Sequence, residues 1–395
     1  MHLFQKFPSG RWQNLMQSPY MPTAKSLLVL GLFSLIVLSL LMIASSSIPY
    51  AQTKGFPELK FFWSQAIYVF VGFLAALIVY QIPLKWYFQM PLVVPAWVLL
   101  NLLLILTLLV APEIFGAKRW LDFGPANLQT SEFVKLLMVL IVSDYVVRRS
   151  AEVRESIWAG LRLLVWYLPV LLLIAIQPDF GSCVVIVATA LVILFISGVP
   201  FSHSVYLVIL AIPVFAIAIL ISDYRSLRIF SFLDPFDDIY KSDYQLARSL
   251  MAFGRGGTTG VGYGDSILKL SHLPEAHTDF ILSITGEELG FLGVMLVFCL
   301  EALIIGCIMR ISYITLKRRQ LRLSYMAFGF ATIIFGQVII NAGMTMALAP
   351  TKGLTLPFYS YGGSSMLMFM MMIAIILKIS KESEKIYHQN KNREY

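Results

Sequence analysis

The sequence has few charged residues: they make up 13% of its 395 positions. A soluble protein of this length carries roughly a quarter. So few charges cannot cover the surface of a water-soluble globule. The hydrophobic residues, 58% of the chain, stand in long runs rather than in stripes of helical period. The composition therefore excludes an ordinary soluble domain and predicts a membrane protein.

Cysteine is also scarce, and zinc-finger and RNA-binding motifs are missing. Cys183, Cys299 and Cys307 lie in apolar runs without C-x-x-C spacing or a histidine neighbour. They are predicted to be small packing residues rather than metal ligands. The net charge of +8 comes from basic residues that stand mostly between the apolar runs. That pattern indicates contact with anionic lipid headgroups and not with nucleic acid.

About ten apolar runs can cross a bilayer as helices, once the shorter ones extend into their polar flanks. Lys and Arg are concentrated in one set of the intervening segments, which predicts that both termini are cytoplasmic. The whole chain, 1–395, is thus expected to be one all-α polytopic membrane domain. The predicted spans lie near residues 26–46, 61–80, 92–110, 133–147, 163–176, 183–197, 205–221, 289–309, 326–346 and 365–377.

One long loop, residues 222–279, separates spans seven and eight and falls on the outer side. It is polar and glycine-rich, and a loop of this length is more often functional than filler. Its many aromatic residues argue against disorder, so it is expected to fold back on the membrane surface. Residues 378–395 form a basic cytoplasmic tail that is expected to be a solvated, mobile end.

The segment Leu273–Phe280 places Glu275, His277 and Asp279 just before an apolar helix. Asp279 is expected in the first turn of that helix, at the outer membrane face. A carboxylate half out of water has a raised pKa and can accept a proton from a hydroxyl group, as a general base does. In the alternative interpretation Thr278 or Asp279 only caps the helix, where an acid suits the helix dipole.

Glycines are dense in the preceding stretch, which ends at Ser266. Neither a strand before it nor a βαβ unit around it is predicted, so it is not a dinucleotide-binding fingerprint. It is either a flexible loop or a backbone that approaches a ligand such as a diphosphate through its N–H groups. The glycines are Gly254, Gly256, Gly257, Gly260, Gly262 and Gly264, and the ligand hypothesis centres on Gly257 and Gly260.

Two cations, Lys118 and Arg119, break the rule that basic residues stay on the cytoplasmic side, and Trp120 follows them. They are either an interfacial anchor or a clamp for a diphosphate, which paired cations neutralise well. Lys269 and Lys352 are weaker candidates for the same clamp.

Several acids stand at or near membrane depth. Glu132 and Lys135 share a helix face at their three-residue spacing, which predicts a structural ion pair or a cavity lining. One of Glu287 and Glu288 is expected to face the cavity or a cation. Asp179 is expected to cap a tight outer turn.

Five motifs, in this order, resemble those of the SEDS (shape, elongation, division and sporulation) family over nearly the whole chain. Thr130 stands where that family usually has Pro, and Arg255 replaces a usual small residue. Ala276 stands where the elongation branch usually has Arg, so the sequence is more similar to the division branch, with an elongation polymerase as the alternative. The motifs are Gly116–Trp120, Gln129–Lys135, Gln177–Gly181, the glycine loop with Leu273–Phe280, and Asn341–Met344 with Pro357–Ser365.

The resemblance implies a peptidoglycan glycosyltransferase that polymerises lipid II into glycan strands. Asp279 would be the base that takes the proton from the 4-hydroxyl of the acceptor GlcNAc. That oxygen would attack the anomeric carbon of the donor MurNAc with inversion and expel undecaprenyl diphosphate. The substrate-binding candidates are Lys118, Arg119, Lys269, Lys352, Gly257, Gly260, Ser266, His277 and Glu275.

The resemblance also implies surroundings and partners. The expected site is the bacterial inner membrane, at the division septum, with a class B penicillin-binding protein transpeptidase and other divisome membrane proteins. No cofactor is required by the sequence. A divalent cation, Mg²⁺ or Mn²⁺, could assist the diphosphate, although no cluster of metal ligands is visible.

Two other classes of function stay open at this point. A flippase for the same lipid would need essential charges deep in the bundle on both sides, whereas the polar residues are concentrated in the outer loops. A scaffold that recruits the transpeptidase would tolerate the loss of Asp279.

Overall fold

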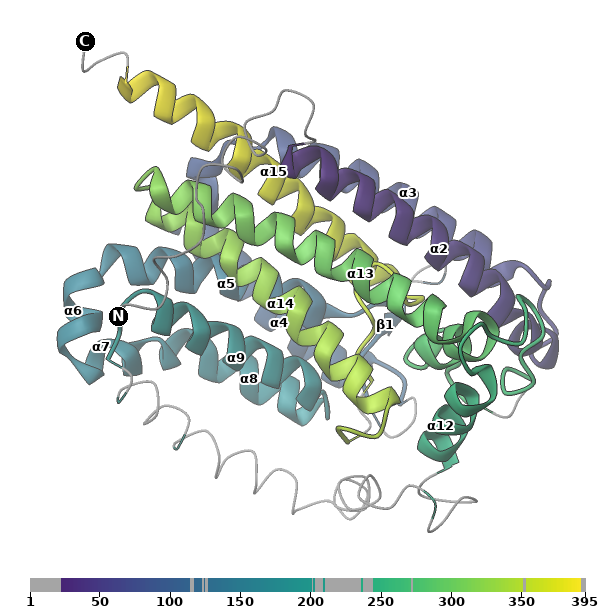
Figure 1. Cartoon of the computed structure of the whole chain (residues 1–395). Coiled ribbons are helices and arrows are strands. Elements are labelled where there is room, and N and C mark those ends of the chain that lie inside the picture. Colours follow the sequence, from purple (N-terminus) through teal and green to yellow (C-terminus); the bar gives the residue numbers. More distant parts are fainter. Residues whose placement is uncertain are drawn as a thin grey trace.

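The structure is a computed structural model in which helices make up nearly all of the regular elements (Figure 1). It describes residues 23–113, 117–122, 124, 127–200, 202, 209, 236, 244–270, 273–350 and 353–391. Its elements are α2 (Ala24–Thr53), α3 (Lys60–Gln81), the 3₁₀ helix η1 (Leu84–Phe88), α4 (Met90–Val110), β1 (Leu121–Asp122), β2 (Asn127–Leu128), α5 (Thr130–Arg148), α6 (Ser150–Glu155), α7 (Ile157–Arg162), α8 (Leu164–Ile176), α9 (Phe180–Ile196), α12 (Tyr244–Gly256), α13 (Ile281–Lys317), α14 (Leu321–Thr345) and α15 (Gly363–Lys391).

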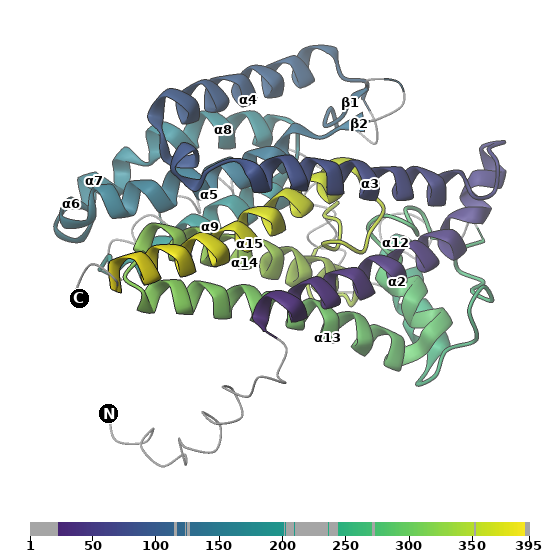
Figure 2. The same ribbon diagram turned by 90° about the horizontal axis from the view of Figure 1, so that it is seen from above.

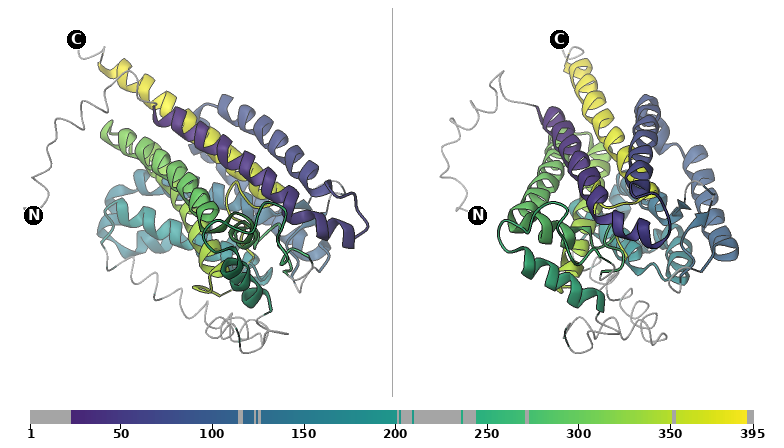
Figure 3. Two further views of the ribbon diagram at one scale, coloured as in Figure 1. Left: turned by 45° about the vertical axis from the view of Figure 1, so that its right-hand side comes forward. Right: turned by 90° about the vertical axis from the view of Figure 1, so that its right-hand side faces the viewer.

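The long helices lie side by side as one bundle (Figures 1 and 2). Helix α15 packs against α3, and α13 packs against both α2 and α14. Lys25 pairs with Glu384 at 2.9 Å, and Arg318 donates to Ser383 at 3.2 Å. The start of α2, the end of α13 and the last turns of α15 therefore share one end of the bundle. The short helix α12 and the start of α13 lie at the other end, as Figure 3 shows.

The predicted all-α polytopic membrane fold is confirmed. Nine of the ten predicted spans fall on helices, namely α2, α3, α4, α5, α8, α9, α13, α14 and α15. All of the run at 205–221 except residue 209 lies outside the described residues. Within the described ranges, six helices are long and apolar enough to cross a membrane. The number of spans and the side on which the termini lie stay predictions.

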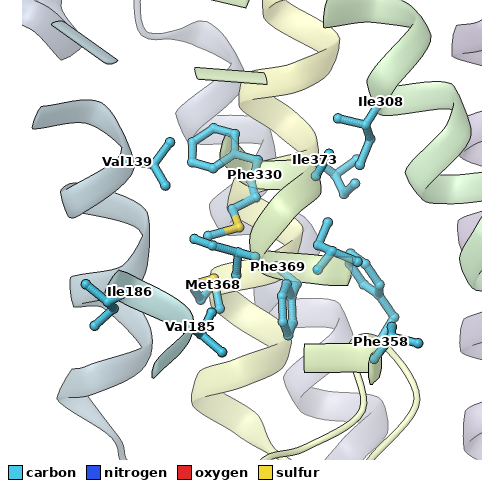
Figure 4. Packing of buried hydrophobic residues seen from close by; sticks show 14 of the residues in the cluster. Val139, Val185, Ile186, Ile308, Phe330, Phe358, Met368, Phe369 and Ile373 are labelled. Carbon is cyan, nitrogen blue, oxygen red and sulfur yellow. The ribbon is translucent and has the colours of Figure 1, made fainter. Parts of the chain in front are cut away.

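The bundle is packed from several helices at once (Figure 4). Phe330 of α14 and Phe369 of α15 are fully buried, with Val139 of α5 and Ile308 of α13 in the same cluster. Helix α3, by contrast, buries only Gln65 and Gly72 and leaves large apolar side chains exposed. An apolar surface of this kind suits contact with lipid rather than with water.

Helix α15 continues past the expected start of the tail, so residues 378–391 are helical, while the mobility of the tail stays a prediction. Two contacts account for this difference. Lys378 pairs with Glu382 at 3.4 Å, one helical turn away, and Ile379 is fully buried. Residues 392–395 lie outside the described residues.

Helix α13 is broken near its start, where Gly290 has a φ of 68° and a ψ of −167°. The glycine loop after α12 satisfies the backbone groups that the break releases. The N–H groups of Val261 and Gly262 donate to the carbonyls of Glu287 and Glu288, at 3.0 and 3.1 Å. In return, the N–H groups at 291 and 292 donate to the carbonyls at 257 and 258, at 2.9 and 3.2 Å. At membrane depth such a break is tolerated only where other groups restore its hydrogen bonds.

This pairing requires close backbone contact, which Gly260 allows. Its φ is +82°, and a Cβ there would collide with the carbonyl of Glu288. Gly254, in α12, has no atom within 4 Å of its Cβ position and no unusual φ.

We predict that Gly260→Ala destabilises the protein by at least about 2 kcal/mol, because it adds backbone strain and a collision. The matched variant Gly254→Ala should be neutral or slightly stabilising, because alanine favours a helix. Thermal unfolding in detergent measures both. Equal unfolding midpoints for the two variants would contradict the backbone pairing.

Candidate active site

Two buried glutamates fix the glycine loop to α13. Glu287 accepts hydrogen bonds from the N–H of Ile267 at 3.0 Å, from the hydroxyl of Ser266, and from Arg255 at 2.5 Å. Arg255, the departure from the family's usual small residue, is thus the cation that balances Glu287. The loop is ordered by these bonds, which disfavours the interpretation of a flexible loop.

Glu288 forms the second attachment. It accepts hydrogen bonds from Ser45 of α2, at 2.6 Å, and from Lys269, at 2.7 Å. Lys269 also donates to the carbonyl of Gly264 at 2.6 Å. The sequence predicted that one of the two glutamates faces the cavity or a cation. In the structure each of them has a cation partner. The side chains of Ser266 and Lys269 are both used in this structural network. Their binding of substrate stays a prediction.

The segment before α13 makes a tight turn that presents Asp279. The backbone carbonyl of Glu275 accepts from the N–H groups of Thr278 and Phe280, both at 3.2 Å. The carboxylate of Glu275 accepts from the hydroxyl of Thr278 at 2.6 Å. Helix α13 begins at Ile281 with Phe280 at its N-cap and no side-chain capping bond. The N-cap position therefore belongs to Phe280 and not to Thr278 or Asp279, and a favourable interaction of the Asp279 carboxylate with the helix dipole stays a prediction.

Asp279 is half-buried and lies close to Arg119. Both its Oδ2 atom and one terminal nitrogen of Arg119 lie next to Gly353. They are within 3.4 Å of the point where a Cβ atom on that glycine would be. Asn341 of α14 donates to the backbone carbonyl of Asp279 at 2.9 Å and to that of Leu354 at 2.7 Å. Residues distant in sequence thus gather around one carboxylate at this end of the bundle.

Backbone carbonyls hold Arg119 in place. Its side chain donates to the carbonyl of Gln177 at 3.2 Å and to that of Pro178 at 2.5 Å. Asp179 caps α9, as predicted, and accepts from the N–H of Ser182 at 3.3 Å and from the hydroxyl of Ser131 at 2.9 Å. Burial acts to raise the pKa of Asp179, but Arg119 and these hydrogen bonds outweigh it and keep that pKa low. The Gln177–Gly181 motif therefore positions the cation.

Lys118 and Lys352 are the other cations that the sequence predicts for the clamp. Lys118 is half-buried and forms no ion pair among the described residues. Lys352 lies outside the described residues, next to Gly353 in the sequence. Gly257 and Gly260 lie in the loop that pairs with α13. This pairing accounts for glycine in the loop without the predicted contact with a diphosphate. These substrate-binding roles stay predictions.

His277 is buried in a cluster of aromatic rings. Its imidazole lies 4.8 Å from the ring of Phe61, 4.9 Å from that of Tyr50 and 5.5 Å from that of Tyr361, between ring centroids. Its backbone carbonyl accepts from the N–H of Tyr361 at 3.1 Å. Burial lowers the pKa of His277 to about 4, so the ring is neutral at neutral pH. It is thus a packing and shape-forming residue rather than a source of positive charge.

Glu132 and Lys135 form a buried ion pair within α5, at 2.7 Å. The second carboxylate oxygen of Glu132 has no hydrogen-bond partner in the described part of the chain. The three-residue spacing therefore predicted the pair correctly.

Sequence reasoning missed Ser45, Asn341 as a holder of Asp279, and the role of Arg255. Each acts through a partner on a distant element, which no local spacing reveals. The only available sign was the polar run Ser45-Ser46-Ser47 inside an apolar helix.

Comparison with known proteins places this arrangement in a family. The sequence profile described as "Cell cycle protein", which groups FtsW, RodA and SpoVE, matches residues 25–385. The chain belongs to this family.

Relatives in the FtsW/RodA/SpoVE family match over almost their full length. A protein of Acinetobacter baylyi named "Probable peptidoglycan glycosyltransferase FtsW" is 38% identical over 377 residues, which is 95% of this chain and 93% of the relative. A protein of Coxiella burnetii with the same name is 42% identical over 364 residues, 90% of this chain and 96% of the relative. The predicted likeness to the division branch, whose member is FtsW, is confirmed by these names.

Solved structures of the family share the fold. One chain, from work described as "Structural coordination of polymerization and crosslinking by a peptidoglycan synthase complex", has a TM-score of 0.73 and 26% identity. The match covers 90% of this chain and 97% of that one. The Thermus thermophilus Rod shape determining protein RodA has a TM-score of 0.65 and 24% identity, with 90% and 96% covered. That second likeness shows the fold alone.

We predict that Lys135→Met costs about 3–5 kcal/mol of stability, because it leaves Glu132 charged, buried and unpaired. Adding Glu132→Gln to the same chain should recover most of the loss. Glu152→Gln, which breaks exposed ion pairs with Arg149 and Arg162, is the control and should change little. Thermal unfolding in detergent is the measurement, and no loss in the Lys135→Met variant would refute the pair's structural role.

We also predict that the protein loses stability as the pH falls from about 6.5 to about 4. In that range the unfolded chain binds a proton at His277 and the folded chain does not, because burial holds the folded pKa near 4. His277→Phe should remove up to about 3 kcal/mol of this pH dependence while it retains the ring packing. The comparison is between unfolding midpoints of the two proteins over that pH range, and parallel curves would exclude a buried neutral imidazole.

Proposed function

We propose that this chain is a peptidoglycan glycosyltransferase that polymerises lipid II into glycan strands. The observation that carries the proposal is the half-buried carboxylate of Asp279 next to the guanidinium of Arg119, in a family whose relatives bear that name. A carboxylate in this position can take a proton, and the adjacent cation can balance a leaving diphosphate.

In the proposed reaction Asp279 removes the proton from the 4-hydroxyl of the acceptor GlcNAc. The oxygen then forms a bond to the anomeric carbon of the donor MurNAc, with inversion. The bond from that carbon to the diphosphate oxygen breaks, and undecaprenyl diphosphate leaves with the electron pair. Arg119, and Lys118 nearby in sequence, neutralise the charge that collects on the diphosphate.

The location and the partner follow from the same proposal. The end of the bundle that carries Asp279 faces outward from the bacterial inner membrane, at the division septum. The partner is a class B penicillin-binding protein, which supplies the transpeptidase, together with other divisome membrane proteins. The support is that the solved structure with a TM-score of 0.73 is described as a synthase complex that coordinates polymerization and crosslinking.

A divalent cation, Mg²⁺ or Mn²⁺, fits this site only as a companion of the substrate. Among the described residues, no three His, Cys, Asp or Glu side chains gather to hold a metal ion. Asp279 would supply one carboxylate, so most ligands of such a cation would be diphosphate oxygens.

We predict that Asp279→Asn lowers polymerisation of lipid II by about 10²–10⁴-fold, because the amide cannot accept the proton. The variant should unfold at nearly the same temperature as the wild type, since its shape is retained. The assay resolves glycan strands on a gel after the purified protein and its transpeptidase partner are supplied with lipid II.

Asp265→Asn is the matched control, because Asp265 is an exposed carboxylate in the adjacent glycine loop. It should polymerise like the wild type. Full activity of Asp279→Asn would exclude Asp279 as the base, and a wild type that makes no polymer would favour the flippase or scaffold alternatives.

A further inference from the structure

A pocket of about 310 Å³ lies between the outer end of α2 and the segment that leads to Asp279. Ser46, Tyr50 and Thr53 of α2 line one side of it. Lys269, Glu275 and His277 are among the residues on the other side. Pockets for small molecules span about 300–1,000 Å³, so this one suits a single ring or a similar group rather than a whole lipid-linked substrate.

The lining combines aromatic faces with small polar groups. Tyr50 is 37% exposed, and its ring lies 4.9 Å from the imidazole of His277, so the two form one aromatic wall. The hydroxyl of Ser46 is buried and has no hydrogen-bond partner among the described residues. An amphipathic ligand that has both C–H faces and hydroxyl groups matches such a wall. A sugar ring has both.

The charges in the pocket disfavour a diphosphate. The ammonium group of Lys269 is neutralised by Glu288 at 2.7 Å. Glu275 contributes a carboxylate, whose hydrogen bond from Thr278 leaves its negative charge in place. A diphosphate would thus meet no uncompensated cation and one anion here. A neutral ligand meets neither difficulty.

The pocket adjoins Asp279 along the chain, and Arg119 is not among its lining residues. His277 lines the pocket, and Asp279 follows it by two residues, a separation of at most about 7 Å along the chain. Arg119 and Gly353 lie beside the Asp279 carboxylate, and neither of them lines the pocket. The guanidinium of Arg119 suits the diphosphate of the donor. The pocket is then the place for the acceptor, the sugar whose hydroxyl gives up its proton.

Glu275 has a φ of 55°, a left-handed conformation that is strained for a residue other than glycine. Such strain persists where the surrounding structure imposes it and is concentrated at ligand sites. Glu275 lines the pocket, and its backbone carbonyl also closes the turn that contains Asp279, since it accepts from the N–H groups of Thr278 and Phe280. The strain therefore links the shape of the pocket to the position of the carboxylate.

We propose that this pocket is the subsite for the acceptor's hexosamine ring, with Tyr50 as the stacking platform that holds the ring beside Asp279. The inference rests on the proposed glycosyltransferase function. It assigns to α2 a role in acceptor binding, and it separates the acceptor subsite from Arg119, which receives the donor diphosphate.

The test uses the full-length protein with its transpeptidase partner and a labelled lipid II analogue whose GlcNAc 4-hydroxyl is blocked. Such an analogue can act only as the donor, so transfer of its label to unblocked lipid II reports one defined step. Tyr50→Ala should raise the apparent KM for the acceptor about three- to tenfold, which corresponds to loss of one aromatic contact. The KM for the blocked donor should stay within about twofold of the wild type, and Tyr50→Trp should restore most acceptor affinity.

Phe56→Ala is the matched control, because Phe56 is an exposed aromatic residue on the same outer segment that does not line the pocket. It should leave both KM values unchanged. If Tyr50→Ala leaves the acceptor KM unchanged, or raises both KM values equally, the subsite is wrong while the polymerase function stands. If the wild type transfers no label, the proposed function fails and the subsite fails with it. Thermal unfolding of each variant identifies a loss of activity that comes from unfolding. If Tyr50→Ala unfolds, the acceptor KM of Tyr50→Trp decides, because the subsite predicts that it stays close to the wild-type value.

Discussion

The break in α13 at Gly290 is the feature on which the end of the bundle that carries Asp279 depends. A helix that stops and restarts at membrane depth releases backbone donors and acceptors, and these must find partners within the protein. The glycine loop supplies them through four backbone hydrogen bonds between 257–262 and 287–292. Close contact of two backbones leaves no room for a Cβ, which is the physical reason for glycine at position 260.

The break also explains two buried glutamates that would otherwise be unfavourable. Glu287 and Glu288 are both buried. Arg255 of α12 balances the charge of Glu287, and Lys269 balances that of Glu288. Through Ser45 the same network reaches α2. The segment that carries Asp279 is thus fixed at both ends, by the loop before it and by α13 after it. Such a rigid frame would keep the carboxylate in a fixed position, as its proposed role requires.

Much of the fold could be predicted from the sequence, because apolar runs and charge placement act locally. The helices of the bundle, the pair of Glu132 and Lys135 and the cap at Asp179 follow from spacing alone. The break in α13 at Gly290 could not be predicted, since the glycine loop that restores its backbone hydrogen bonds is recognised only in the folded chain. The contacts of Arg119 and Asn341 likewise join distant segments, so only the folded chain places them beside Asp279.

The most direct test of this account is hydrogen–deuterium exchange of the backbone amides at residues 260–262, in the wild type in lipid nanodiscs. We expect the amides of Gly260, Val261 and Gly262 to exchange as slowly as those of the long helices, because they donate to carbonyls at 256, 287 and 288. Exchange at the rate of an exposed loop would contradict the account, since the glycine loop would then not be held by the break in α13.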